Sequence, residues 1–227
     1  MTRLLLALAA ALAGALLGLL THRLNQALGA AEPEATGAPL PREALWAPIL
    51  DGVLLGLLGF RLGVSATTLL EAAVTVALVQ VLVFDARHRL ILNRVIYPAT
   101  LLAIVLIPVN PLLGDQIVVR LLSGGLGALI AGGVFLILVV ASRGGVGLGD
   151  AKLTFFMGAA LGIAPPGLNV IRALIYGVVL GAVAAALLLV SRRRGLRDYI
   201  AYGPYLCAGG VIAMLFPCGL LGPTSCG

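Results

Sequence analysis

Long runs of apolar residues recur along the whole chain, separated by short polar segments or by segments rich in glycine and proline. About 20 helical residues cross a hydrocarbon core of about 30 Å. Runs of roughly that length predict eight membrane-spanning helices near residues 3–21, 45–63, 66–85, 93–109, 117–141, 152–164, 170–190 and 199–217. We therefore expect an all-α, polytopic membrane helix bundle that forms a single domain over residues 1–227.

The composition supports a lipid environment for this bundle. Apolar residues make up 61% of the chain and charged residues 11%, whereas soluble domains have about half and about a quarter. The net charge of +6 does not indicate a nucleic-acid partner, because the basic residues lie in short loops without interleaved aromatic residues. The three cysteines include no CxxC pair, so a zinc-ribbon or thioredoxin-like motif has no support in the sequence.

The loops on one side of the predicted bundle carry 11 of the 15 basic side chains. These are Arg23, Arg42, Arg87, Arg89, Arg94, Arg143, Lys152, Arg192, Arg193, Arg194 and Arg197. Because cytoplasmic loops carry an excess of Lys and Arg, this bias predicts that side in the cytoplasm and both termini outside. As an alternative, residues 1–30 form a cleaved signal peptide, since Arg3 precedes an apolar run and small residues follow it.

Two aspartates lie at ends of predicted spans on this cytoplasmic side. Asp85 ends the third span in the run VLVFDARHRLILNR, and Asp150 opens the sixth in the run GGVGLGDAKLTFF. A charged group near lipid costs roughly 2.5 to 3.5 kcal/mol on insertion scales, so each needs a reason to be there. One reason is structural, because a helix-end aspartate often caps its helix or pairs with a base, here Arg87, Arg89 or Lys152.

Two carboxyl groups held together in a poorly hydrated site can instead cleave a peptide bond. They cannot easily both ionise, so one keeps its proton while the other acts as a base. The base takes a proton from water, the water attacks the carbonyl, and the protonated partner donates a hydrogen bond to the developing oxyanion. The glycines of GVGLGD, among them Gly147 and Gly149, suit this chemistry, since glycine permits positive φ and close approach to a substrate backbone.

These segments resemble the bacterial prepilin leader peptidases, a GxGD-type family of intramembrane aspartic proteases. GLGDAKL at 147–153 is similar to the family's second catalytic motif, and FDARHRLILNRVIYP at 84–98 is similar to its first. IAYGPYLCAGG at 200–210 resembles a late Phe-Gly-Pro-Phe element, and GALLGLLTHRLNQ resembles the end of the family's first helix. Together the four segments are spread over most of the chain.

The resemblance implies Asp85 and Asp150 as the catalytic pair, with Gly147, Gly149 and Lys152 supporting the motif or the substrate. It implies a hydrolase of the bacterial inner membrane that removes the short basic leader of a prepilin or pseudopilin at the cytoplasmic face. Such an aspartic endopeptidase would serve type IV pilus assembly or type II secretion. Its partners would be the substrate and the lipid bilayer, and a homodimer is left open. Three roles are open for Lys152. It could lower the pKa of Asp150, it could bind a lipid phosphate, or its side chain could extend to the membrane interface.

The chain departs from many relatives in the loop after the first span. Those relatives have a large cytoplasmic loop with CxxC motifs that bind zinc, and they methylate the new amino terminus with S-adenosylmethionine. Here the loop at 21–44 is short and has no cysteine. We therefore expect neither zinc nor S-adenosylmethionine as a cofactor, and the sequence does not support N-methyltransferase activity. The first motif also has Leu92-Asn93 where many relatives have Pro followed by Asp or Asn.

The remaining polar residues have structural interpretations, and two alternative functions receive less support from the sequence. Asp51 and Glu71 fall inside predicted spans, where we expect hydrogen bonds between helices. The alternative is that they hold a substrate amine or tune the pKa values of the aspartate pair. His22 and His88 are predicted as polar loop residues, because one histidine per loop makes a poor metal site. The alternative functions are a small ion-coupled transporter, which lacks a supporting internal repeat, and an inactive pilus-assembly scaffold of the same fold, which would not need both aspartates.

Overall fold

The computed structural model describes residues 2–30, 46–63, 65–142, 146–163, 169–190 and 202–216. Its helices are α1 (Thr2–Ala30), α2 (Trp46–Leu62), α3 (Ala66–His88), α4 (Asn93–Leu106), α5 (Ile117–Ala141), α6 (Leu148–Leu161), α7 (Asn169–Val190) and α8 (Gly203–Leu215). Two 3-10 turns, η2 (Ile107–Val109) and η3 (Pro111–Leu113), follow α4. Each helix coincides with one of the predicted apolar runs, so the expected all-α bundle is confirmed.

Among the helix ends that differ from the prediction are the ends of α1 and α3 and the start of α6. α1 continues to Ala30, because the leucine, glutamine and alanine residues after the apolar run are good helix formers. The prediction of loop positions for His22 and His88 is therefore wrong, since both lie in helices and His22 is buried. α3 ends one turn after Asp85, and α6 starts at Leu148, which places Asp150 in its first turn.

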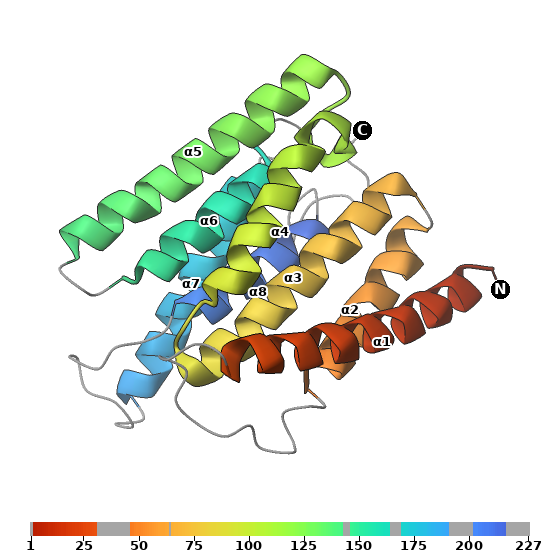
Figure 1. The fold of residues 1–227 in the computed structure, drawn as a ribbon, viewed down its shortest axis with the longest axis horizontal. Helices are drawn as coiled ribbons and strands as arrows, with labels where there is room; N and C mark the ends of the chain where they lie inside the picture. Colours follow the sequence, from red (N-terminus) through yellow and green to blue (C-terminus); the bar gives the residue numbers. More distant parts are fainter. Residues whose placement is uncertain are drawn as a thin grey trace.

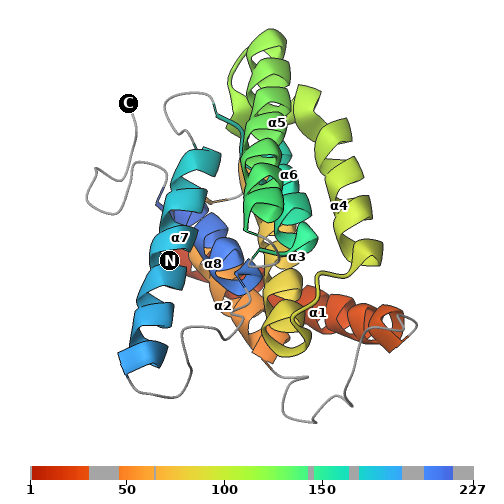
Figure 2. The same cartoon turned by 90° about the vertical axis from the view of Figure 1, so that its left-hand side faces the viewer.

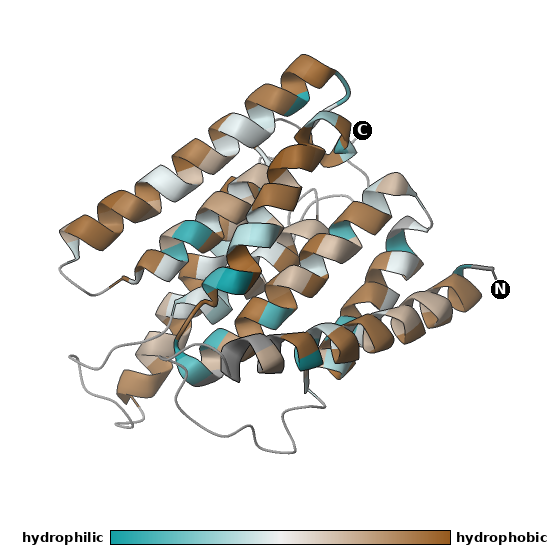
Figure 3. Cartoon of the chain, in the orientation of Figure 1, coloured by the Kyte–Doolittle hydropathy of each residue, from teal (hydrophilic) through white to brown (hydrophobic). Residues whose placement is uncertain are grey.

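Within the residues that the structure describes, four helices are long and apolar enough to cross a membrane, over Arg3–Leu24, Ala66–Ala86, Ile117–Ala141 and Asn169–Val190. Two apolar helices in the same residues are shorter, Asn93–Val109 and Gly203–Leu215. The outer faces of α1 and α5 are mostly hydrophobic (Figure 3), with leucine and valine side chains that the protein leaves uncovered. The chain is thus a polytopic helical membrane protein, and the outside location of its termini stays a prediction.

Successive helices run in alternating directions, so the ends of α1, α3, α5 and α7 lie toward one side of the bundle (Figure 1). We call this side the aspartate end, because Asp85 lies in the last turns of α3 and Asp150 in the first turn of α6. Figure 2 views the bundle from this side. Arg89 and Lys152 also lie here, as the charge bias predicts, whereas Arg120 lies near the start of α5 at the far end (Figure 1).

Small residues bring helices close together, and the tightest pairs are α1 with α2, α5 with α6, and α7 with α8. A side chain on Gly127 or Gly158 would collide with the backbone of the facing helix. A side chain on Gly209 would collide with the backbone of Gly177. In lipid, helices associate largely through such packing. α6 is enclosed by its neighbours, with most of its residues buried, so it can be shorter than the lipid-facing helices.

Polar side chains of Gln80 and Arg61 tie helices together outside the aspartate cavity. Nε2 of Gln80 on α3 donates a hydrogen bond to Oδ2 of Asp51 on α2 at 3.0 Å, which confirms the interhelical hydrogen bond predicted for Asp51. Arg61, in the last turn of α2, donates to the carbonyl oxygen of Leu215, and its guanidinium lies 5.0 Å from the ring centroid of Phe216. Arg61 thereby satisfies one of the last carbonyl groups of α8.

Candidate active site

Asp85 lies one turn before the end of α3. Arg89 caps the helix in a left-handed conformation with φ of 53°, and its N–H donates to the carbonyl oxygen of Asp85 at 2.8 Å. This conformation is uncommon for residues other than glycine, and here it turns the chain sharply toward α4. The Asp85 side chain is only 4% exposed. A buried carboxyl group therefore lies close to the point where the chain leaves the helix.

Asp150 is the third residue of α6 and caps its first turn. Its Oδ2 accepts a hydrogen bond from the N–H of Gly147 at 3.3 Å, while its own N–H donates to the carbonyl oxygen of Gly147 at 3.1 Å. A carboxylate at this position satisfies a free N–H group and interacts favourably with the helix dipole. The capping interpretation thus holds for Asp150, and the same bond orients its carboxyl group.

Both aspartates line one cavity of about 260 Å³ at the aspartate end. The other lining residues are Arg89, Leu90, Ile91, Asn93, Gly147, Leu148, Gly149, Lys152 and Tyr202. The two carboxyl groups are near enough to interact electrostatically. A cavity of this size has room for several water molecules. The structure thus brings the predicted catalytic pair together with Gly147, Gly149 and Lys152, and the roles of these residues stay predictions.

The glycines of the GLGD motif act through their size. Gly147 has φ of −84°, and Gly149 lies in the first turn of α6 without a positive φ, so neither residue adopts the positive φ that glycine permits. A Cβ atom on Gly149 would lie 3.1 Å from Cβ of Ile91, in the segment between α3 and α4. Gly149 therefore lets this segment pack against the start of α6. That contact brings Asp85 toward Asp150.

The start of α8 borders the cavity beside Asp85. A Cβ atom on Gly203 would collide with Oδ2 of Asp85, so glycine leaves the space that the carboxyl group occupies. Tyr202 lines the cavity. Cys207, one turn into α8, is fully buried and lies within electrostatic reach of both aspartates. Sequence reasoning assigned none of these α8 residues to the site, and its one signal was the YGP element named in the resemblance.

Lys152 links the first turns of α6 and α4 beside the cavity. Its Nζ donates a hydrogen bond to Oδ1 of Asn93 at 2.8 Å and lies 5.0 Å from the ring centroid of Tyr97. Asn93 is the first residue of α4, and Tyr97 follows one turn later. These contacts indicate a further role for Lys152 that the sequence did not suggest, the positioning of the two helices.

The other buried acids lie away from this cavity. Asp51 is fully buried, and its Oδ1 has no hydrogen-bond partner among the described residues. Oε2 of Glu71 also lacks a partner within the described ranges, so the interhelical bond predicted for Glu71 is not found at that atom. Within the same ranges, no three His, Cys, Asp or Glu side chains gather as metal ligands would. Most of the short loop at 21–44, and both Cys218 and Cys226, lie outside the described residues.

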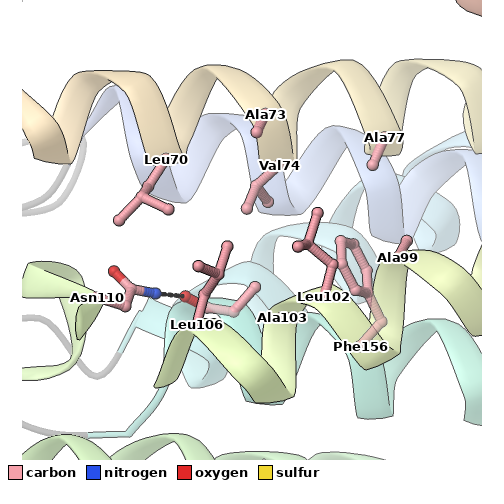
Figure 4. A pocket seen from close by; sticks show the side chains of 11 residues that line it. Leu70, Ala73, Val74, Ala77, Ala99, Leu102, Ala103, Leu106, Asn110 and Phe156 are labelled. Carbon is pink, nitrogen blue, oxygen red and sulfur yellow. Dashed lines mark hydrogen bonds between the residues drawn. The ribbon is translucent and has the colours of Figure 1, made fainter. Parts of the chain in front are cut away.

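A separate small cavity lies between α3, α4 and α6 (Figure 4). It has a volume of about 60 Å³, and its lining is apolar apart from Asn110, whose Nδ2 donates to the carbonyl oxygen of Ala160 at 3.0 Å. Neither Asp85 nor Asp150 lines it. We interpret it as a packing gap between α3 and α4 that plays no part in the site.

Comparisons with known proteins agree with the motifs. Residues 72–190, which include both aspartates, match the model of the type IV leader peptidase family. The prepilin leader peptidase/N-methyltransferase of Bacillus subtilis (strain 168) is 28% identical to the chain over 174 residues, covering 75% of the chain and 64% of that protein. The chain thus covers less than two thirds of this relative's length. No solved structure matches the chain.

Proposed function

This chain belongs to the type IV leader peptidase family, and from this premise we propose that it is a membrane-embedded aspartic endopeptidase. Its proposed substrates are prepilin-like proteins, either prepilins or pseudopilins, and its reaction removes their short basic leader. The name of the Bacillus subtilis relative supports this substrate class. The proposed physiological setting is type IV pilus assembly or type II secretion.

The shared cavity of Asp85 and Asp150 is the observation that supports this function best. Buried acids are costly in a membrane protein, so each one needs a structural or functional reason. Helix capping accounts for Asp150, but it does not require Asp85 to face the same cavity. Two buried carboxyl groups that line one cavity suit a pair that divides the work of acid and base.

In the proposed reaction, one aspartate begins protonated and the other ionised. The ionised carboxylate takes a proton from a water molecule in the cavity, and the water oxygen bonds to the carbonyl carbon of the scissile peptide. The protonated partner donates its proton to the carbonyl oxygen as negative charge develops there. The first aspartate then protonates the leaving nitrogen, the C–N bond breaks, and the second recovers a proton from the gem-diol. The pair is left with one shared proton, as it began.

The proposed location is a bacterial inner membrane with the aspartate end toward the cytoplasm. The excess of basic residues in the loops of that side supports this orientation, and Arg89 and Lys152 line the cavity itself. Cleavage would then occur at the cytoplasmic membrane surface. A basic leader stays on that side, because positively charged segments next to a membrane span remain in the cytoplasm.

We further propose that the chain acts as a peptidase without the methyltransferase activity in its relative's name. The segment at 21–44 holds no cysteine, so it offers no CxxC motif to bind zinc. The proposed enzyme needs neither zinc nor S-adenosylmethionine. Mass spectrometry of the cleaved product, after incubation with S-adenosylmethionine, should find an unmethylated amino terminus.

The experimental test uses the purified chain in liposomes together with a membrane-embedded prepilin-like substrate. Mass spectrometry of both fragments identifies the bond that is cleaved. Asp85→Asn and Asp150→Asn keep the shape of the side chain but remove the acid, and each should abolish leader release. Asp51→Asn is a matched control, because Asp51 is also buried but lies outside the cavity. Parent-level cleavage by either Asp85→Asn or Asp150→Asn would overturn the catalytic assignment.

A further inference from the structure

A lateral groove runs between α4 and α5, with α6 as its floor. Its volume is about 520 Å³, about twice that of the aspartate cavity. α4 and α5 each pack on α6 but hardly on each other (Figure 2), which leaves this side of the bundle open. Its lining includes Tyr97 of α4, Leu129 and Leu136 of α5, and Phe155 of α6. The groove is therefore apolar and faces the surroundings of the protein.

The groove adjoins the aspartate cavity. Leu148 and Lys152, both in the first turn or two of α6, line the groove and the cavity alike. The hydrogen bond from Lys152 to Asn93 lies at this junction. An object lying along the groove would thus have one end beside Asp85 and Asp150.

The α5 side of the groove has open space at one of its two glycines. Gly132 and Gly133 both line the groove, but Gly132 is buried against Phe155 of α6. No described atom lies within 4 Å of a Cβ atom built on Gly133, so the space in front of it is open. Leu129 and Leu136 flank the glycines and are 64% and 49% exposed. Small residues between large apolar ones allow close approach of a second helix in lipid.

We infer that this groove binds the apolar segment of the membrane-embedded prepilin-like substrate and directs its scissile bond into the aspartate cavity. The inference rests on the proposed function and extends it to the mode of substrate binding. The shared lining at Leu148 and Lys152 is the reason to choose this occupant, because it places one end of the groove beside the two aspartates. A substrate whose apolar segment is joined to its cleavage site needs one path from the bilayer to the carboxyl groups. A lipid chain or a second copy of the protein would need only the apolar groove and would have no need of the adjoining aspartate cavity.

The first test blocks the groove without disturbing the fold. Gly133→Phe adds a side chain into the open space, and Gly125→Phe is its matched control on α5. Gly125 is half-buried like Gly133, has no described atom within 4 Å of an added Cβ, and does not line the groove. In liposomes, Gly133→Phe should lower kcat/KM for the full-length substrate by about tenfold or more, while Gly125→Phe stays near the parent. Equal rates for both variants would overturn the inference.

The second test locates the bound substrate directly, in an Asp150→Asn background that leaves it uncleaved. Leu136→Cys lies in the groove, whereas Leu138→Cys is similarly exposed on α5 but faces elsewhere. A cysteine in the apolar segment of the substrate should form a disulfide with position 136 and not with position 138, above the level that the native cysteines give. If the disulfide forms at position 138 alone, the inference about the groove is wrong. It is also wrong if neither position forms a disulfide while the parent still cleaves. Both outcomes leave the proposed function unaffected. A parent that cleaves nothing would refute the proposed function instead.

Discussion

Asp51 and the pair of Asp85 and Asp150 are all buried carboxyl groups on helices, yet their surroundings differ. Asp51 lies in the second turn of α2 and is fully enclosed. Gln80 bonds one of its oxygens, and a Cβ atom on Gly18 would lie 2.6 Å from the same oxygen. Asp85 and Asp150 lie within a turn of helix ends and line a cavity that can hold water. Burial is common to all, whereas access to water distinguishes the pair.

The difference has a physical cause in where each residue lies along its helix. Within a helix, the backbone groups are paired and neighbouring helices can close around a side chain, as α1 and α3 do around Asp51. At helix ends, backbone groups are left unpaired and the chain changes direction, which leaves room for polar groups and water. An acid in the first setting ties helices together, and acids in the second can take part in chemistry.

The largest expected effect comes from removing either member of the pair. Asp85→Asn or Asp150→Asn should lower the rate of leader release by about 10³-fold or more, because acid–base catalysis is lost. The double variant should be no more than a few-fold slower than either single variant, because the two groups act as a unit. Asp51→Asn should retain parent activity. Losses that multiply in the double variant would show that the two aspartates act independently.

A smaller effect is expected from Gly203→Ala, which places a methyl group where Oδ2 of Asp85 lies. Displacing this carboxyl should lower kcat by about 10- to 100-fold with little change in KM. Gly210→Ala is the control on the same helix, because its methyl group would meet only the ends of the Leu78 and Met157 side chains. Thermal unfolding in detergent checks that both variants are folded. Equal losses in both would point to the packing of α8 instead of Asp85.

Lys152→Met should have a modest effect, because it removes one hydrogen bond and one ammonium–ring contact at a partly exposed position. We expect kcat/KM to fall about three- to tenfold, in line with a net value of about 1 kcal/mol for such contacts. Asn93→Ala should behave alike, and the double variant should show coupling between the two sites. Additive losses would mean that the bond between Lys152 and Asn93 does not position the helices.

The smallest effect on cleavage is expected from Gln80→Leu, which acts on the Asp51 region alone. This substitution removes the hydrogen bond from Gln80 to Oδ2 of Asp51, whose Oδ1 already lacks a partner among the described residues. The free energy of unfolding should therefore fall by about 1 to 3 kcal/mol. Adding Asp51→Leu should restore part of this loss, because no unpaired acid then remains buried. Cleavage by the folded protein should match the parent. Loss of cleavage without loss of folding would place the α2–α3 contact within the active site.

Much of the fold could be predicted because membrane helices are specified locally. Each run of apolar residues must span lipid with its backbone groups paired internally, which requires a helix whatever its neighbours are. The order of the helices follows from the order of the runs, and their alternating direction follows from the short loops. Asp85 and Asp150 stood out because acids are rare in such a sequence, and the loop charges placed both at the same end.

The tertiary structure alone decided the contacts that turn these helices into a site. The end of α1, the packing of Gly149 on Ile91 and the fit of Gly203 against Asp85 depend on how far helices approach and how they are rotated. The same holds for the bond between Gln80 and Asp51 and for the open groove beside α5. These contacts join residues distant in the chain, and apolar runs that look alike can pack in many rotations. Hydrophobic pattern therefore determines that helices form, while side-chain shape determines which faces meet.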